Sequence, residues 1–366
     1  MEIFTKKTKD ILTGFRFDEI PFEQLRKKLK TTGYRPSDFQ FKSKITPLAS
    51  KEISQYPVIN SKQYTDYKNA GENAIKNGQV AVAILNGGMA TRFGGIPKGA
   101  VHAAGTRSFI DLKISQAMQI GGSQMPVFLM NSHATELATL QHLKKLKFGA
   151  NVKNFRQFVS LRLMENGEYF LTENAQVSPC SSGHGDFPYA LNNCTEFKKF
   201  VSQGGKYITL SNVDNLGASL DPVIIGSHIA NCKSVSVELV KTQHGDTGGF
   251  PAGVDKKTCI VEGFRLPSSF DKNFINIFNT NTFVFNVETI AEPPELEWFF
   301  VKKEVDNTQV IQFERLVGQM TEHFNVNWIL VSRTGAESRF VPIKVLADLE
   351  TRKSDLHAVL LKQGVL

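Results

Sequence analysis

The sequence predicts an α/β fold built on a doubly wound, mixed and mostly parallel sheet. Short apolar runs with the length of buried strands recur along the chain, and stretches with helical spacing separate them. With 366 residues, 41% of them hydrophobic and 21% charged, the chain can bury a large core and has the composition of an ordinary globular protein.

The first predicted core strand is the run 80–85, which is apolar throughout and is therefore expected to be buried on both faces. A helix at 67–77 precedes it. Further strands are predicted at 126–130, 207–211, 235–239 and 282–286, with helices at 136–145 and 196–203. Open α/β sheets bind ligands beyond the carboxyl ends of their strands, so the loops that begin at Asn86, Asn131 and Asn212 are where we expect the chemistry.

The pattern divides the chain into three parts. Residues 1–75 form an N-terminal helical and loop extension, in which 22–29 has helical spacing. Residues 76–330 form the α/β core, and residues 331–366 form a short C-terminal tail with a strand at 340–344 and a helix at 347–361.

Charge and hydropathy exclude several classes of function. The formal net charge is +8, but the Lys and Arg residues are scattered, so we expect no nucleic-acid partner. The longest useful apolar run, 80–85, is far shorter than the roughly 20 residues that cross a bilayer, and we expect no membrane partner. The first residues lack the apolar core and cleavage site of a secretory signal, which favours a cytoplasmic location.

A glycine-rich segment, 85–99, follows the first core strand directly. Glycines after a buried strand let backbone N–H groups point at anionic oxygens, and Arg92 and Lys98 add positive charge where phosphates would lie. The segment is not a Walker loop, because Lys98 is not followed by Ser or Thr, and it lacks the GxGxxG spacing of a dinucleotide site. It therefore predicts a phosphate site of another kind.

Four further segments follow in order. They are Ser182-Gly-His-Gly-Asp, Ser211-Asn-Val-Asp-Asn-Leu-Gly, Phe278-Asn-Thr-Asn-Thr and Arg339-Phe-Val-Pro-Ile-Lys. Together with the glycine loop they span residues 85–344 and resemble the UTP–glucose-1-phosphate uridylyltransferase family, which belongs with the UDP-sugar pyrophosphorylases. The resemblance implies a Rossmann-like nucleotide-sugar transferase fold, in which residues 76–330 are the nucleotidyltransferase catalytic core and residues 331–366 complete the active site.

The resemblance also implies a nucleotide site. The glycine loop would hold the phosphates of UTP, and a glycine and an amide would contact uracil. A base edge can be recognised by backbone groups where no side chain intrudes, and an amide satisfies both a donor and an acceptor. The residues assigned to the nucleotide in this way are Leu85, Asn86, Gly87, Gly88, Gln157, Gly183 and His184.

The remaining implied roles concern the metal, the sugar and the reacting phosphates. Asp214 follows an apolar strand and is assigned to Mg²⁺, although an Asp there could also cap the next helix. The neighbouring Asn212 and Asn215 favour a polar cluster over a cap alone. The sugar hydroxyls are assigned to Asn212, Glu262, Asn279, Asn281 and Lys241. The catalytic charges are assigned to Lys98, Lys344 and Arg92.

The implied reaction transfers the uridylyl group of UTP to a sugar 1-phosphate, glucose 1-phosphate above all, and releases pyrophosphate reversibly. The attacking phosphate is already ionised, so catalysis would consist of alignment and neutralisation of charge, without a protein nucleophile. The chain stops about twenty residues after Lys344, before the extra β-helix domain of the eukaryotic members, so we expect a monomer or a small homo-oligomer.

Three alternatives remain open. Arg92 occupies a place where N-acetylglucosamine members carry arginine and glucose-specific eukaryotic members lack it, so the enzyme could be a UDP-N-acetylglucosamine or a broad-specificity UDP-sugar pyrophosphorylase. A non-catalytic nucleotide-sugar sensor would keep the pocket, but such a binder could lose Lys98, Asp214 or Lys344. An NAD-dependent dehydrogenase would need an acidic residue about 20 residues after the loop, and Asp111 there looks like the start of a helix.

Overall fold

The computed structural model describes residues 3–90, 96–246, 248–255 and 257–366. No helix among them combines the length and the apolar character that crossing a membrane requires. The α-helices of the described residues are α1 (Lys6–Gly14), α2 (Glu19–Thr32), α3 (Lys62–Lys76), α4 (Phe109–Gly121), α5 (Glu136–Leu146), α6 (Phe187–Asn192), α7 (Thr195–Ser202), α8 (Pro222–Ala230), α9 (Val287–Ala291), α10 (Leu346–Thr351) and α11 (Lys353–Lys362).

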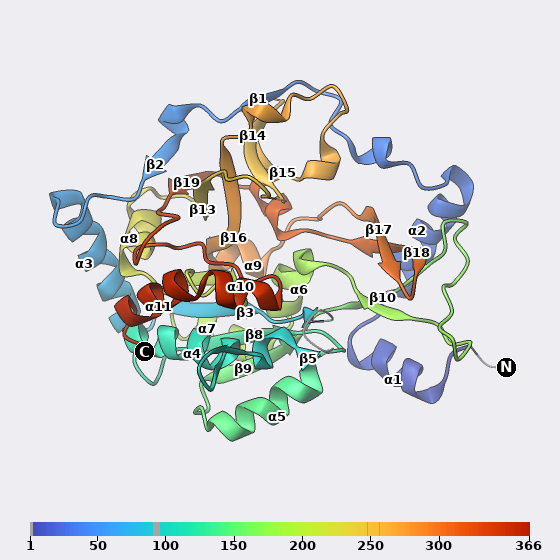
Figure 1. The fold of residues 1–366 in the computed structure, drawn as a ribbon, viewed down its shortest axis with the longest axis horizontal. Coiled ribbons are helices and arrows are strands. Elements are labelled where there is room, and N and C mark those ends of the chain that lie inside the picture. Colours follow the sequence, from blue (N-terminus) through green and yellow to red (C-terminus); the bar gives the residue numbers. More distant parts are fainter. Residues whose placement is uncertain (1–2, 91–95, 247, 256) are drawn as a thin grey trace.

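Eight strands of the described residues form one mixed sheet (Figure 1). In spatial order they are β2 (Ile53–Gln55), β19 (Val326–Leu330), β13 (Val235–Lys241), β16 (Ile277–Asn286), β12 (Tyr207–Asn212), β3 (Val80–Leu85), β8 (Val127–Asn131) and β9 (Val152–Arg156). Neighbouring strands are parallel except at β16, which runs antiparallel to both β13 and β12. The predicted mixed, mostly parallel sheet is therefore confirmed.

Smaller sheets lie around the main one (Figure 1). Their strands are β1 (Ile45–Pro47), β14 (Phe250–Val254) and β15 (Lys257–Val261) in one sheet, then the pairs β17 (Phe299–Val305) with β18 (Thr308–Glu314), β10 (Val159–Leu161) with β11 (Pro179–Ser181), β4 (Met89–Ala90) with β5 (Ile96–Pro97), and β6 (His102–Ala104) with β7 (Arg107–Ser108). The first 75 residues thus contribute strands β1 and β2 to sheets as well as helices.

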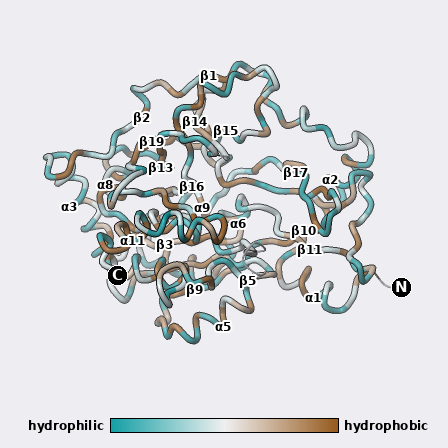
Figure 2. The backbone as a smooth tube through the Cα atoms, in the orientation of Figure 1, coloured by the Kyte–Doolittle hydropathy of each residue, from teal (hydrophilic) through white to brown (hydrophobic). Residues whose placement is uncertain are grey.

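Helices cover both faces of the main sheet. Val82 of β3 lies in a core with residues of α3, α4, α8 and α11, whereas the next residue, Ala83, lies in a second core with residues of α6, α7 and α9. All six residues of β3 are buried, as the uninterrupted apolar run predicts. Figure 2 shows the complementary pattern on an outer helix, α5, along which hydrophilic and hydrophobic residues alternate.

The strand order reverses between β3 and β12. From β3 the chain continues to β8 and β9 on one side, and it then returns to β12 on the other side. Strands β3 and β12 are parallel and end together, with Leu85 paired to Asn212. Reversals of this kind open a crevice at the carboxyl ends of the strands, and ligands bind there.

The predicted C-terminal strand at 340–344 is wrong. In this segment Pro342 forms an isolated bridge with Asn215. A proline has no N–H to extend a ladder, and the N–H groups of Val341 and Ile343 donate instead to Asn215 Oδ1 (2.9 Å) and to the Asp214 carbonyl (3.1 Å). The helix expected at 347–361 is divided into α10 and α11 at Arg352.

Helices α3 and α8 contact each other backbone to backbone. A Cβ atom built on Gly71 would lie 1.8 Å from the carbonyl oxygen of Pro222, and one built on Gly226 would lie 1.8 Å from the carbonyl oxygen of Tyr67. Both glycines are therefore required by the close approach of the two helices.

Replacement of Gly226 by alanine should lower the free energy of unfolding by about 1–3 kcal/mol, because α8 must move away from α3. Gly149→Ala is the matched control: no atom of the described residues lies within 4 Å of a Cβ built there, and its change should stay within about 0.5 kcal/mol. Urea unfolding of both variants tests this contact. Equal stabilities would contradict it.

Candidate functional site

The glycine loop leaves β3 with its first residues firmly held. The Asn86 side chain turns inward, and its Nδ2 donates to Asn131 Oδ1 (2.7 Å) and Thr139 Oγ1 (2.9 Å). The Gly87 carbonyl accepts from Ser132 Oγ (2.8 Å). The Asn86 amide thus fixes the loop to β8 and α5. Leu85 is buried, and its carbonyl accepts from the Val213 N–H (3.1 Å).

Three of the predicted nucleotide residues meet beside this loop. Gln157 Nε2 donates to the Gly183 carbonyl at 2.8 Å, and a Cβ on Gly87 would lie 2.3 Å from Gln157 Oε1. Gly183 has φ +88°, a left-handed conformation that favours glycine. A side chain at Gly87 would displace Gln157, so the glycine and the amide form one unit.

His184 is held by its ring. The Val317 N–H donates to His184 Nδ1 at 3.0 Å, which leaves the proton of the neutral ring on Nε2. Burial lowers the pKa of His184 to about 4. The imidazole is therefore neutral at pH 7 and is suited to a hydrogen-bonding role rather than to neutralising phosphate charge.

Asp186 anchors the same segment from behind. It is fully buried, and it accepts hydrogen bonds from Ser182 Oγ and from Arg315 Nη2, both at 2.7 Å. The Arg315 guanidinium lies over the rings of Tyr189 and Trp298, 4.3 and 4.2 Å from their centroids. Burial raises the pKa of Asp186 to about 6, so the carboxylate is ionised at pH 7 and depends on Arg315.

The centre of the site is an ion pair across the reversal of strand order. Lys98 Nζ and Asp214 Oδ2 lie 2.5 Å apart, and the two side chains are 15% and 19% exposed. The Lys98 N–H donates to the Gly88 carbonyl (3.3 Å), which connects this pair to the glycine loop. The Asp214 carbonyl accepts a hydrogen bond from the Ile343 N–H. The next residue in the chain is Lys344, which is exposed. The structure thus brings the predicted Lys98, Asp214 and Gly88 together.

The predicted sugar residues form a connected series. Asn281 Nδ2 donates to Asn212 Oδ1 (2.9 Å), and the Asn281 N–H donates to Asn279 Oδ1 (3.0 Å). The Asn279 N–H in turn donates to the Gly249 carbonyl (3.0 Å), and a Cβ on Gly249 would lie 2.8 Å from Glu262 Oε1. Asn281 has φ +57°, a conformation that asparagine tolerates. Asn281 therefore takes part both in a local turn with Asn279 and in a contact with Asn212.

Glu262 and Lys241 complete the predicted set. Among the described residues the Glu262 carboxylate has no hydrogen-bond donor or cation within bonding distance, and burial raises its pKa to about 7. Lys241 ends β13 and is exposed. The pKa of Asp246 is lowered overall. Burial raises this pKa, but the hydrogen bonds from Arg333 lower it, and the positive charge of the nearby Lys344 lowers it further. Arg92 lies outside the described residues.

The metal prediction can be compared with the donors present. The described residues contain no group of three or more His, Cys, Asp or Glu side chains that could hold a metal ion. Mg²⁺ differs from metals that need such cages, because it is commonly bound by one or two carboxylates together with substrate phosphates. The single Asp214 carboxylate beside the glycine loop fits a shared site of this kind and does not fit an all-protein one.

The sequence named Asn215 as part of a polar cluster at the site and did not single out Lys113. Asn215 is buried, and its side chain bonds to the backbone of Gly217, Arg339 and Val341 rather than facing a ligand. Lys113 is 3% exposed inside the core. The burial of Lys113 could have been predicted, because Lys113 lies four residues after Phe109, on the same side of a helix that begins there.

These observations define the class of the protein. It is an α/β protein whose predicted ligand residues gather at the carboxyl edge of a mixed sheet, on both sides of a reversal in strand order. A family model described as UTP–glucose-1-phosphate uridylyltransferase matches residues 22–365. The chain therefore belongs to the UTP–glucose-1-phosphate uridylyltransferase family.

Curated relatives carry the same name. The UTP–glucose-1-phosphate uridylyltransferase of Saccharomyces cerevisiae is 30% identical over 334 residues, which cover 83% of this chain and 64% of the yeast protein. That of Solanum tuberosum is 28% identical over 307 residues, covering 77% of this chain and 62% of the potato protein. The chain thus spans less than two thirds of the length of these relatives.

Solved structures show the same fold. UDP-glucose phosphorylase from Trypanosoma brucei superposes with a TM-score of 0.76 at 23% identity, over 93% of this chain and 76% of the other. The uridine diphosphate N-acetylglucosamine pyrophosphorylase of the same organism gives 0.71 at 18% identity, over 95% and 82%. A UDP-glucose pyrophosphorylase mutant from Leishmania major, in complex with UDP-glucose, gives 0.70 at 21%, over 94% and 78%.

Removal of Arg315 should expose how much the Ser182–Asp186 segment depends on it. Arg315→Met leaves the Asp186 carboxylate buried without its cation and should lower the free energy of unfolding by about 3–5 kcal/mol. Lys30→Met, which breaks an exposed pair with Glu168, should leave the urea midpoint unchanged. If both variants unfolded at the same urea concentration, the anchoring role of Arg315 would be wrong.

Proposed function

We propose that the protein transfers the uridylyl group of UTP to glucose 1-phosphate and forms UDP-glucose and pyrophosphate, reversibly. The observation that carries the proposal is the Lys98–Asp214 pair, which joins the glycine loop to the segment that bears Lys344. The family and the names of its curated members support the substrates. Because the chain covers only part of those relatives, its own residues must be shown to suffice.

The proposal includes the finer features that the sequence predicts. The sheet with helices on both faces is assigned to the doubly wound, Rossmann-like type of the nucleotide-sugar transferases. We place the protein in the cytoplasm, as a monomer or a small homo-oligomer, with UTP and a sugar 1-phosphate as its partners and without nucleic-acid or membrane partners.

In the proposed reaction a phosphate oxygen of the sugar 1-phosphate attacks the α-phosphorus of UTP in line, and pyrophosphate leaves. The bond from the α-phosphorus to the bridging oxygen breaks as the new phosphorus–oxygen bond forms. Lys98 exchanges its contact with Asp214 for phosphate oxygens, and Lys344 and Arg92 add positive charge. Asp214 and the substrate phosphates would hold Mg²⁺, which supplies further positive charge to the phosphate oxygens.

The remaining residues bind and orient the substrates. Gly87, Gln157 and Gly183 form the edge that contacts uracil. Leu85 and Asn86 tie the glycine loop to the sheet, with the Asn86 N–H donating to the Met130 carbonyl (2.9 Å), and the loop backbone from Gly87 and Gly88 onwards directs N–H groups at the phosphates. The neutral His184 donates a hydrogen bond from Nε2. The sugar hydroxyls contact the uncharged amides and the Glu262 carboxyl of the connected series, with Lys241 at its rim.

The decisive experiment offers UTP and Mg²⁺ with a panel of sugar 1-phosphates and detects pyrophosphate. Activity with glucose 1-phosphate, and little with the N-acetylglucosamine compound, is expected. Preference for N-acetylglucosamine 1-phosphate would identify the alternative pyrophosphorylase. Binding of UDP-glucose without turnover of any sugar would contradict the enzyme and favour the sensor.

Lys98→Met and Asp214→Asn should each lower kcat about a hundredfold, on the scale of one lost electrostatic contact to a transition state. Lys62→Met removes an exposed lysine at the start of α3 and should leave kcat unchanged. Steady-state pyrophosphate release measures all three. Near-normal kcat in both site variants would refute the assigned roles.

A further inference from the structure

The loop that carries Asp214 is held from inside the protein by a buried lysine. Lys113, on α4, is 3% exposed. Its Nζ donates to Ser211 Oγ (2.8 Å), to the Asn215 carbonyl (3.3 Å) and to the Ala218 carbonyl. An ammonium group has three donors, so every donor of Lys113 is used by one short stretch of chain.

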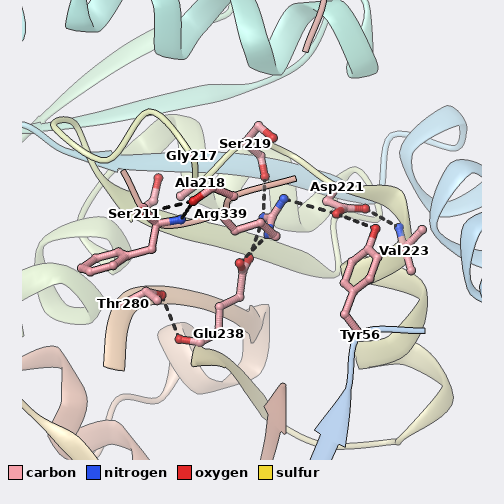
Figure 3. Close-up of polar contacts among 12 residues, drawn as sticks. Tyr56, Ser211, Gly217, Ala218, Ser219, Asp221, Val223, Glu238, Thr280 and Arg339 are labelled. Carbon is pink, nitrogen blue, oxygen red and sulfur yellow. Dashed lines mark hydrogen bonds and ion pairs between the residues drawn. The ribbon is translucent and has the colours of Figure 1, made fainter. Parts of the chain in front are cut away.

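A second buried cation holds the far end of the same loop (Figure 3). Arg339 donates to both carboxylate oxygens of Glu238 (2.5 and 2.6 Å), to Asp221 Oδ2 (3.2 Å) and to the Ser219 carbonyl (3.0 Å). Tyr56 also donates to Asp221 (3.1 Å). Arg339 is thus compensated by two carboxylates, so its buried charge is not left unpaired.

Lys113 differs from Arg339 in its partners. Its three acceptors are a hydroxyl and two carbonyls, and none is a carboxylate. Burial lowers the pKa of Lys113 to about 7, which shows that its position is unfavourable for the charged form. A leucine at this place on the apolar stripe of α4 would avoid that cost. The three hydrogen bonds to the 211–218 segment offset the cost of burying the ammonium group, and a leucine could not form them.

The contacts of Lys113 lie on both sides of Asp214. Ser211 precedes Asp214 by three residues in β12, and Asn215 follows it directly. The Asp214 carboxylate itself faces Lys98. Fixing the chain before and after Asp214 therefore fixes the direction of its Cα–Cβ bond, and the contact with Lys98 then holds the carboxylate.

We propose that Lys113 is a positioning residue that holds the 211–218 segment so that Asp214 is presented to the substrate phosphates and their metal ion. This role rests on the proposed uridylyl transfer. The buried side of α4 thus has a role in the reaction, although Lys113 makes no contact with the predicted ligand residues themselves.

Lys113→Met keeps the length and the apolar stem of the side chain and removes all three donors. Hydrogen–deuterium exchange of the amides in 211–218, measured without nucleotide or metal, should become about tenfold faster or more. In the transferase assay, the Mg²⁺ concentration that gives half the maximal rate should rise about tenfold, while the KM for UTP at saturating Mg²⁺ stays within twofold. Lys113→Gln, which restores uncharged donors, should recover part of both effects.

His228→Leu is the matched control for a buried polar side chain. His228 lies on α8, and its ring bonds to Ser236 Oγ and Asn286 Oδ1, both at 2.8 Å, at the other end of the sheet from Asp214. It should lower the urea midpoint, because it leaves Ser236 and Asn286 without their partner, and it should change neither the exchange of 211–218 nor the Mg²⁺ dependence.

The outcomes separate the two proposals. Unchanged exchange of 211–218 in Lys113→Met would overturn the positioning role, as would faster exchange with the Mg²⁺ dependence of the parent. A parent protein that turns over no sugar 1-phosphate would overturn the proposed function, and the role of Lys113 in a reaction would fall with it.

Discussion

The site depends on one interaction, the ion pair of Lys98 and Asp214 across the reversal of strand order. The two side chains are only 15% and 19% exposed, so each needs a partner of opposite charge, and a ligand of the right charge can take that partner's place. The pair holds together the loop after β3 and the loop after β12. In the proposed reaction, the main-chain donors and cations around this pair gather two polyanions that repel each other in water.

The surroundings of this pair are held by hydrogen bonds within the scaffold, although Asn86 Oδ1 and Arg315 Nε find no partner among the described residues. The Asn86 amide is bonded to β8 and α5, and Asp186 with Arg315 anchors the segment of Gly183. On the other side Lys113 uses all its donors on the chain around Asp214. Lys98 and Asp214 are part-buried at the site, whereas the fully buried Asp186 and Lys113 are bonded to the scaffold.

The sequence predicts the parts of this arrangement that local rules determine. The apolar run of β3, the glycine loop and Asp214 at the end of a strand follow from pattern and residue type. It fails where tertiary contacts decide. The strand predicted at 340–344 is only an isolated bridge at Pro342, because the N–H groups of Val341 and Ile343 bond to the Asp214 loop. The contacts of Lys113 with Ser211 and Ala218, and those of Asn215 with Arg339 and Val341, could not be predicted because the partners are about 100 or more residues away along the chain.

The most direct test of the central claim is a crystal structure of the protein with Mg²⁺ and a non-hydrolysable UTP analogue. The account predicts the triphosphate at the turn after β3, with Lys98 Nζ within hydrogen-bond distance of a phosphate oxygen and no longer paired with Asp214. A triphosphate bound elsewhere, with the Lys98–Asp214 contact intact and Asp214 remote from every phosphate, would contradict it.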